Sequence, residues 1–337
     1  MKQWIILVVL ACCAQGALGG VGFSRLTVPD PMGGQMQVSL WYPSQAPNTD
    51  VQLGPFRFEA TRDAPIAPGR HKLVIVSHGT AGSDLGHRNI ALELASRGVI
   101  AAAPLHPRDN YRDQSGVGKH IVMAGRPKQL GALIDSLLAH RRWGAAIDAD
   151  RIGAFGFSLG GYSVLGLVGA TASETDMRAH CRQTPADPFC EIVGAAVTTR
   201  ISNRTSWHNR ADRRVCAIAL ADPVAAPFST AGIASVSVTH ARVWRPEFSN
   251  VLLGSAHGGR VVAALNSRPE RQQVEEVVVP GAQHYSFLAP FPDAIRRRLP
   301  AALTADATSF DRRVFQKAFA KEASAFLDSS LDRCPLP

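Results

Sequence analysis

Apolar residues in this chain fall alternately into short continuous runs and helical repeats. Residues 72–77, 98–104 and 151–155 are mostly apolar runs that predict buried strands. Between them, residues 89–97 and 129–143 repeat apolar side chains at the spacing of helices that face a core. Continuous apolar strands that alternate with helices are typical of a mostly parallel sheet covered on both faces. We therefore predict an α/β fold built on such a sheet.

The pattern changes on either side of this centre. Residues 38–43 predict a strand that forms an antiparallel edge hairpin with residues 21–28, and the Pro-, Asp- and Gly-rich residues 44–70 predict loop with short extended pieces. Residues 170–213 are polar and cysteine-bearing, which predicts an insertion within one domain of residues 20–337. The second half adds three strands and a closing amphipathic helix, at 215–221, 236–244, 274–280 and 310–327.

The first nineteen residues have the pattern of an export signal. Lys2 gives a positive start, residues 5–11 an apolar core, and residues 17–19 a small-residue cleavage site. A buried N-terminal strand or helix is the alternative, and Cys12 allows lipoprotein cleavage, although the small residues favour ordinary cleavage. The apolar core is shorter than the ~20 residues that span a membrane. We expect an exported protein, periplasmic or secreted, with no transmembrane segment.

The formal net charge is +9, and it falls to +8 when the leader with its one lysine is removed. The only dense basic run, at residues 296–298, lies on a predicted helix and is interpreted as a solvated face. The sequence has no RNP-like motif, zinc-finger spacing or basic-aromatic interleaving, so nucleic acid is not expected as a partner. The surplus charge would favour weak association with anionic surfaces or anionic esters.

Four cysteines remain after the leader, an even number that permits disulfides in an exported chain. Cys181 and Cys190 bracket a polar loop with two prolines, and we predict a disulfide between them. Cys216 lies inside an apolar run and is predicted to be a buried thiol, while Cys334 stays unassigned. No C-x-x-C pair or Cys/His cluster suggests a metal site, and no cofactor is implied.

The sequence Gly-Phe-Ser-Leu-Gly at residues 156–160 joins a predicted strand to a predicted helix. Glycines two before and two after Ser158 let the backbone turn sharply without Cβ clashes, which exposes the serine Oγ above a sheet. This pattern indicates the nucleophile elbow of an α/β-hydrolase. The alternative is a Gly-rich strand-to-helix turn with a solvated serine.

A serine nucleophile needs a base, and His284 is the best candidate. It follows the last predicted strand, and the chain order serine, acid, histidine is that of α/β-hydrolases. A lone histidine in a loop is more often a surface residue. The assignment of His284 as the base therefore depends on the nucleophile elbow found upstream. The competing histidines lie earlier in the chain, at His78, His87, His106 and His240.

Backbone amides are the expected donors to the oxyanion. Residues 77–83, Ser-His-Gly-Thr-Ala-Gly-Ser, directly follow a buried strand. In α/β-hydrolases this loop supplies one N–H and the residue after the nucleophile supplies another. We assign the N–H groups of Thr80 and Leu159. The alternative is a Gly-rich loop with no catalytic part.

Three carboxylates compete for the role of the acid. Asp222 ends the apolar run at residues 215–221, where it would project at the carboxyl edge of the sheet. Glu247 occupies the equivalent place after the following strand and is the alternative acid, and Asp187 in the cysteine loop ranks third. Asp222 is favoured, although an Asp before Pro is also a common turn residue.

The segments that carry a family resemblance are residues 41–43, 76–83, 94–98, 106–107 with 109–110, 151–153 with the elbow, 219–223 and 281–288. Together they resemble a bacterial group often labelled predicted dienelactone hydrolase, close to the platelet-activating-factor acetylhydrolase family. The resemblance covers most of the mature chain. It implies an α/β-hydrolase fold with Ser158 as nucleophile, His284 as base and Asp222 as acid, since the acid of acetylhydrolases follows the strand after the nucleophile strand.

Three features depart from that group. Phe157 stands where many relatives have His, which would alter the pocket wall and leave the mechanism unchanged. Ser249 stands where related hydrolases can carry an acid, which again favours Asp222. True dienelactone hydrolases use a cysteine nucleophile, whereas the elbow here holds serine, so the label does not give the activity.

The sequence therefore predicts a serine carboxylesterase that acts on a small-molecule ester. Short-chain acyl esters are the substrate that the resemblance implies, and no residue by itself selects an acyl chain or an alcohol. An amidase or peptidase with the same triad is the alternative enzyme. A non-catalytic binding protein on the same scaffold is the alternative from another class.

Overall fold

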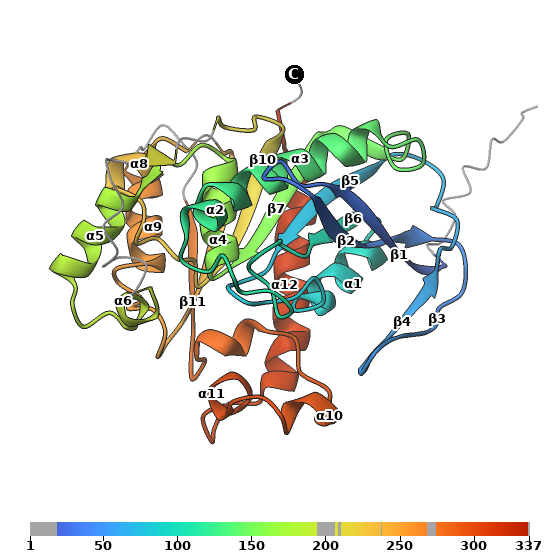
Figure 1. The fold of residues 1–337 in the computed structure, drawn as a ribbon. Helices are drawn as coiled ribbons and strands as arrows, with labels where there is room; N and C mark the ends of the chain where they lie inside the picture. Colours follow the sequence, from blue (N-terminus) through green and yellow to red (C-terminus); the bar gives the residue numbers. More distant parts are fainter. Residues whose placement is uncertain (1–18, 194–205, 208–209, 237, 268–273, 336–337) are drawn as a thin grey trace, which may run out of the picture.

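A ten-stranded mixed sheet forms the centre of the protein, with helices on both faces (Figure 1). The computed structural model describes residues 19–193, 206–207, 210–236, 238–267 and 274–335. The expected leader lies almost wholly outside these residues. Among the described residues, no helix combines the length and apolar character that crossing a membrane requires.

Six neighbouring strands of the sheet run parallel, in the spatial order β12-β11-β10-β7-β5-β6. This arrangement confirms the mostly parallel sheet that the apolar pattern predicts. The carboxyl ends of these strands meet at one edge, where open α/β sheets collect their functional groups. The strands are β5 (His71–Ser77), β6 (Ile100–Pro104), β7 (Ile147–Phe157), β10 (Val215–Ala221), β11 (His240–Pro246) and β12 (Glu275–Val279).

The predicted N-terminal hairpin is also present. β1 (Gly20–Pro29) and β2 (Gln35–Ser44) pair antiparallel over their full length, and β2 joins the parallel strands by pairing antiparallel with β6. The hairpin does not end the sheet, however, because two further strands follow β1 in the spatial order.

Residues 44–70 are more regular than predicted. They hold a second hairpin, made of β3 (Thr49–Leu53) and β4 (Phe56–Arg62), which extends the sheet beyond β1. Val51 and Phe58 pair across this hairpin and are both buried. The strands are short, and the turn-forming residues around them obscure the alternation of apolar and polar side chains. The composition therefore predicted mainly loop where the structure has a paired hairpin.

Alternate side chains of the parallel strands enter two separate cores. In β5, Leu73 and Ile75 belong to one core, while Val74 and Val76 belong to the other. The first core is covered by α2 (His120–Met123), α3 (Gly125–Ala139), α4 (Leu159–Leu167), α8 (Thr230–Ala234) and α9 (Gly258–Asn266). The second is covered by α1 (Arg88–Ser96) and α12 (Arg312–Asp332).

The segment predicted as an insertion follows α4 and lies at the β11 end of the sheet (Figure 1). Part of it, at residues 194–205 and 208–209, lies outside the described residues. Cys181 and Cys190 form the predicted disulfide, with Cα atoms 5.6 Å apart. The described elements are β8 (Ala172–Ser173), α5 (Glu174–Gln183), α6 (Pro188–Ile192) and β9 (Ser206–Trp207).

The prediction of a free thiol at Cys216 is wrong. Cys216 is buried as expected, but it forms a disulfide with Cys334, 118 residues later in the chain. The reason is tertiary: α12 packs against β10, and this brings Cys334, two residues beyond the end of the helix, next to the strand. A contact of this range leaves no trace in the local apolar pattern.

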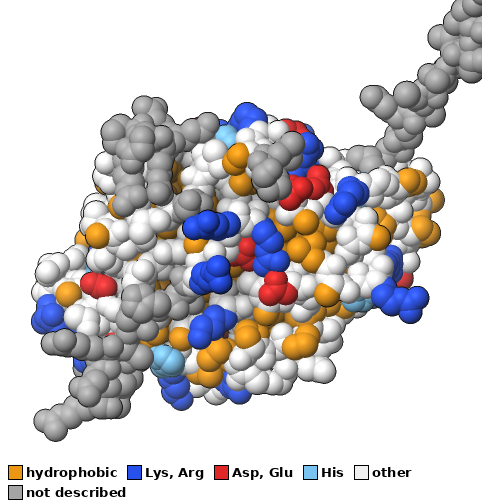
Figure 2. Space-filling model, turned by 90° about the horizontal axis from the view of Figure 1, so that it is seen from above, with side chains coloured by type: hydrophobic (Ala, Val, Ile, Leu, Met, Phe, Trp, Pro, Cys, Tyr) orange, Lys and Arg blue, Asp and Glu red, His pale blue; other side chains and the backbone are white. Residues whose placement is uncertain are grey.

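Basic side chains do not form one continuous patch on the face seen in Figure 2. Lys and Arg side chains are spread over it with acidic side chains between them. The dense run at residues 296–298 begins at the end of α10 (Asp293–Arg296) and is exposed, as expected for a solvated face. The remaining short helices are η1 (His284–Phe287) and α11 (Ala301–Thr304).

Candidate active site

Ser158 occupies the turn between β7 and α4, with φ 55° and ψ −121°. A positive φ is strained for a residue with a Cβ and marks a backbone held by its surroundings. The flanking glycines are required by close packing. A Cβ at Gly156 would collide with the carbonyl of Gly160, and one at Gly160 would collide with the carbonyl of Ser77. The structure therefore has the sharp strand-to-helix turn that the sequence predicts.

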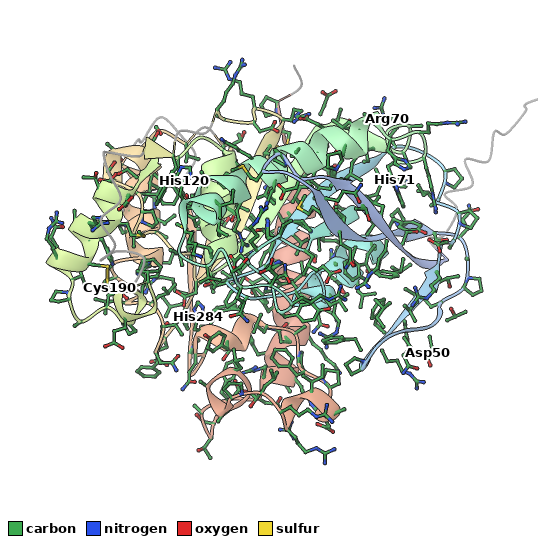
Figure 3. All side chains as sticks on the ribbon, viewed as in Figure 1. Asp50, Arg70, His71, His120, Cys190 and His284 are labelled. Carbon is green, nitrogen blue, oxygen red and sulfur yellow. A yellow bond between two sulfur atoms is a disulfide. The ribbon has the colours of Figure 1, made fainter. Side chains whose placement is uncertain are left out.

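Ser158, His284 and Asp222 form one hydrogen-bonded chain. The Ser158 hydroxyl lies 3.1 Å from His284 Nε2, and His284 Nδ1 lies 2.6 Å from Asp222 Oδ2. His284 begins η1, which follows β12 (Figure 3). Asp222 is fully buried, and the Ser249 hydroxyl donates a second hydrogen bond to its Oδ2 at 3.3 Å. The arrangement can move a proton from serine to imidazole while a carboxylate holds the ring.

Backbone hydrogen bonds join Ser158 to residues on either side of Asp222. The Ser158 N–H donates to the carbonyl of Ala221, the residue before Asp222, and the Ser158 carbonyl accepts from the N–H of Val224. The Asp222 N–H donates to Trp244 on β11. These backbone contacts link the carboxyl ends of three neighbouring strands, β7, β10 and β11, at the site.

The alternative acids lie elsewhere. Glu247 is exposed, and its Oε2 accepts the N–H of Gly281 at 2.8 Å, so it caps a turn rather than contacting His284. Asp187 binds two other histidines, His180 and His257. Of the three predicted candidates, only Asp222 lies within hydrogen-bond distance of His284.

The competing histidines also have other partners. His78 and His106 contact each other beside the loop that follows β5, since the His106 N–H donates to His78 Nε2. His87 packs between Phe155 and Phe157, with ring centroids 5.1 Å and 5.3 Å away. The fourth, His240, begins β11 and therefore lies at the opposite end of that strand from the site.

The predicted oxyanion loop packs against the serine. A Cβ built on Gly79 would lie 3.1 Å from Ser158 Cβ, so the backbone of this loop approaches the nucleophile as closely as glycine permits. Thr80 follows and is exposed. Leu159 is the first residue of α4, and the first amides of a helix have no partner within the helix. The two assigned amides therefore come from segments that both contact Ser158.

A buried ion pair, which sequence reasoning missed, lies behind this loop. Arg126 Nη1 is 2.6 Å from Asp109 Oδ2, and both side chains are fully buried. Arg126 also contacts Ser77 and Ser163, at 3.4 Å and 3.0 Å. Residues 109–110 belong to the segments that carry the family resemblance, which was the one available signal. Arg126 lies on the buried side of a helix, where the apolar period gives no reason to expect an arginine.

A cavity of about 520 Å³ opens beside the same loop. Its mostly apolar wall comes from the turn between β3 and β4, the loop after β5, Phe157, and the segment after His284. Phe157 does form part of the pocket wall, as expected. The charged lining residues are arginines, and burial lowers the pKa of Arg88 among them to about 10, so its guanidinium stays protonated at neutral pH.

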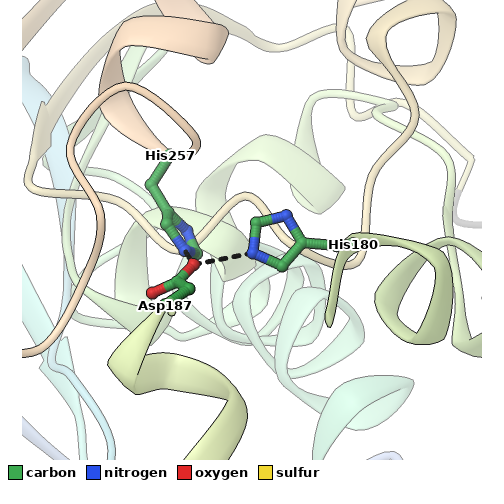
Figure 4. Close-up of side chains that lie close together, drawn as sticks. All are labelled: His180, Asp187 and His257. Atoms are coloured by element: carbon green, nitrogen blue, oxygen red, sulfur yellow. Dashed lines mark hydrogen bonds and ion pairs between the residues drawn. The ribbon is translucent and has the colours of Figure 1, made fainter. Parts of the chain in front are cut away.

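His180, Asp187 and His257 form a second buried cluster (Figure 4). Both histidines donate from Nε2 to Asp187 Oδ2, at 2.7 Å and 2.6 Å. The N–H of Ala225 donates to His257 Nδ1, which fixes the proton of this neutral ring on Nε2. A protonated Nε2 has no lone pair for a metal. With this proton position, the cluster forms a hydrogen-bonded bridge between the insertion and the start of α9.

No family model matches the sequence, and no curated protein gives a significant match. Solved structures do match. A ferulic acid esterase from Streptomyces cinnamoneus is 18% identical, with a TM-score of 0.59, over 96% of this chain and 94% of that one. A dienelactone hydrolase-like promiscuous phosphotriesterase from metagenomic libraries is 14% identical, with a TM-score of 0.52, over 94% and 99%. The chain has the α/β-hydrolase fold.

The α/β-hydrolase fold accounts for where the three side chains lie. Ser158 follows β7, Asp222 follows β10 and His284 follows β12, so all three meet at the carboxyl edge of the parallel strands. Their order along the chain is the order of this fold. The dienelactone hydrolase-like structure agrees, at the level of fold, with the resemblance found in the sequence.

Proposed function

We propose that this protein is an exported serine hydrolase that cleaves carboxylic esters. The observation that carries the proposal is the hydrogen-bonded chain from Ser158 through His284 to Asp222. A serine hydroxyl becomes a strong nucleophile only when an adjacent base takes its proton. The name of the ferulic acid esterase among the matching structures supports the same class of reaction.

In the proposed mechanism, Ser158 Oγ attacks the ester carbonyl while His284 Nε2 takes the hydroxyl proton. Asp222 keeps the imidazole in the tautomer with a proton on Nδ1 and stabilises the imidazolium. The N–H groups of Thr80 and Leu159 bind the oxyanion. The alcohol leaves with the proton from Nε2. Water then loses a proton to Nε2 and attacks the acyl-enzyme, and Ser158 regains its proton as the carboxylic acid departs.

We propose short-chain acyl esters as substrates. The cavity of about 520 Å³ beside the oxyanion loop lies within the range of small-ligand sites, and its apolar wall suits the hydrocarbon part of an ester. Its charged lining residues are arginines without a carboxylate, which favours neutral or anionic esters over cationic ones. Two disulfides support export, since such bonds persist in oxidising compartments.

The test replaces the nucleophile and measures ester turnover. Ser158→Ala should fold normally and hydrolyse p-nitrophenyl acetate at least ~1,000-fold more slowly, because removing the nucleophile leaves only residual catalysis. Wild type should be labelled by a fluorophosphonate and the variant should not. Ser96→Ala, which removes an exposed hydroxyl on α1, is the matched control.

Three results would contradict the proposal. Turnover by Ser158→Ala above about a tenth of wild type would exclude this serine, because losses on removing a triad member are far larger. Faster cleavage of matched anilides than of esters would indicate an amidase or peptidase. Absence of labelling and turnover in folded wild type would indicate a non-catalytic binding protein.

A further inference from the structure

Buried charged side chains form hydrogen bonds with the backbone of the oxyanion loop. Its residues 78–81 leave β5 and approach Ser158, and Thr80, the proposed donor, lies at the third position. An oxyanion donor stabilises the transition state only if its N–H is fixed in direction before the charge develops. Exposed loops do not fix an amide by themselves. The buried groups that bind the loop on either side of Thr80 therefore determine how well its N–H can stabilise the oxyanion.

Arg126 holds the loop before Thr80. Its Nη2 donates to the carbonyl of His78 and lies 3.4 Å from the hydroxyl of Ser77, the last residue of β5. Its Nε donates to the hydroxyl of Ser163 on α4, the helix that begins next to the nucleophile. One planar guanidinium thus connects the end of β5, the oxyanion loop and α4.

Asp109 holds the loop after Thr80. Its Oδ1 accepts the N–H of Ala81 at 2.8 Å, while its Oδ2 accepts from Arg126. Ala81 has a φ of 54°, a conformation that is strained for alanine and needs support from its surroundings. The ion pair therefore binds the backbone at His78, two residues before Thr80, and at Ala81, one residue after it.

The neighbouring rings complete this support without adding charge. Burial and the nearby Arg126 hold the pKa of His78 well below its usual value, so the ring is neutral. The neutral ring accepts from the His106 N–H at Nε2 and donates from Nδ1 to the carbonyl of Gly79. A fully buried ion pair is often no more stable than apolar residues of the same volume. Folding stability therefore does not account for the Arg126–Asp109 pair, whereas its hydrogen bonds to the loop backbone do.

We propose that the buried Arg126–Asp109 pair positions the Thr80 amide in the oxyanion hole, so that both side chains are positioning residues for catalysis. This inference rests on the proposed esterase function. Loss of the pair would leave the ester-binding cavity in place but let the amide turn away from the developing oxyanion. The effect should therefore fall on kcat and not on KM.

Two variants probe the pair with little change in volume. Arg126→Lys keeps the positive charge opposite Asp109 but cannot reach His78, Ser77 and Ser163 together. Asp109→Asn is isosteric but presents an N–H group to one of its two donors. Each should lower kcat by about 10- to 100-fold with KM changed less than about 3-fold, which is the cost of a misplaced rather than a missing donor.

A tetrahedral analogue separates positioning from general damage. A trifluoromethyl ketone forms an oxyanion on Ser158, so its Ki should rise by the same factor by which kcat/KM falls. Titration of active sites with a fluorophosphonate corrects for any misfolded fraction. Lys72→Met is the matched control, because it removes an ion pair with Asp328 and Asp332 at the opposite end of β5. It should lower Tm and leave both kcat and Ki unchanged.

The outcomes are distinct. Unchanged kcat per titrated site in Arg126→Lys and Asp109→Asn, with only a lower Tm, would overturn the positioning role. So would a fall in kcat with an unchanged Ki for the ketone. An inactive wild type, or an active Ser158→Ala, would instead overturn the esterase proposal on which this inference rests.

Discussion

Backbone strain in this protein collects around the candidate site. The non-glycine residues with positive φ among those described are Asp63, Ala81, Arg108, Ser158 and Asp222. Two of these belong to the proposed triad, Ala81 follows the proposed donor Thr80, and Arg108 precedes Asp109. Strained conformations of this kind persist only where surrounding contacts outweigh their cost of ~1–3 kcal/mol. Their clustering here supports a functional role for this edge of the sheet, independently of any motif.

The proposed acid can be tested side by side with its competitor. Asp222→Asn should keep the fold and lower ester turnover by about 10⁴, because the imidazole then adopts the wrong tautomer. Glu247→Gln should change turnover little, since that side chain is exposed and accepts only the Gly281 N–H. Both variants are assayed with the same ester, and fluorophosphonate labelling reports the active fraction. The reverse pattern would move the acid to β11.

Single residues differed in how well the sequence could reveal them. Ser158 and His284 lie in local patterns, a glycine-flanked turn and a loop after the last strand, and these are visible without a structure. Asp222 needed the order of strands as well. Arg126 could not be found, because its role depends on contacts with Asp109 and with the backbone of His78, which are 17 and 48 residues away.

Secondary-structure elements were predictable where a regular pattern of apolar residues extended over many positions. The strand at 215–221 coincides with β10, and the closing helix is displaced by only a few residues from α12. The hairpin of β3 and β4 was understated because each strand is short and its neighbours favour turns. β4 is stabilised by pairing with β1, and a contact between strands so far apart in the chain cannot be inferred from the local sequence.

The insertion is linked to the acid through one carboxylate. Asp187 accepts from His180 on α5, from His257 at the start of α9, and from the N–H of Leu253. Ser249, which donates to Asp222, precedes Leu253 on the same loop. These hydrogen bonds lower the pKa of Asp187 although burial alone would raise it. The insertion is therefore expected to stabilise the loop that supports the acid.

Asp187→Asn should lower the free energy of unfolding by about 1–3 kcal/mol, because a buried acceptor of several hydrogen bonds is lost. Urea denaturation measures this as a lower midpoint with an unchanged m-value. Asp176→Asn, on the same insertion but less buried, is the control and should change the midpoint little. Equal midpoints for the two variants would exclude Asp187 as the link.

Three buried histidines couple the stability of the fold to pH. Burial lowers the pKa of His87 to about 3 and holds the pKa values of His78 and His106 well below the usual value. The unfolded chain binds these protons at pH ~6.5, whereas the folded chain does not. Their contribution to stability is therefore present above pH ~6.5 and is lost as the pH falls, by up to about 1.4 kcal/mol per unit for each histidine.

Urea denaturation at pH 7.5 and pH 5 should show this loss. His87→Phe should flatten the pH dependence, because it removes one of the rings whose pKa burial lowers. Phe suits the site since His87 already packs between Phe155 and Phe157. The matched control is His120→Phe, which replaces an exposed ring. An unchanged slope in His87→Phe would show that this ring does not titrate between the two states.

The hydrogen bond between Ser158 and His284 joins residues that are 126 positions apart in the chain. A ribosome therefore makes the nucleophile long before it makes the base. Any nascent or truncated chain that stops before residue 284 holds a serine with nothing to deprotonate it. Under the proposed function, hydrolysis therefore depends on a late folding event, in which β12 joins the sheet and brings the imidazole to the elbow.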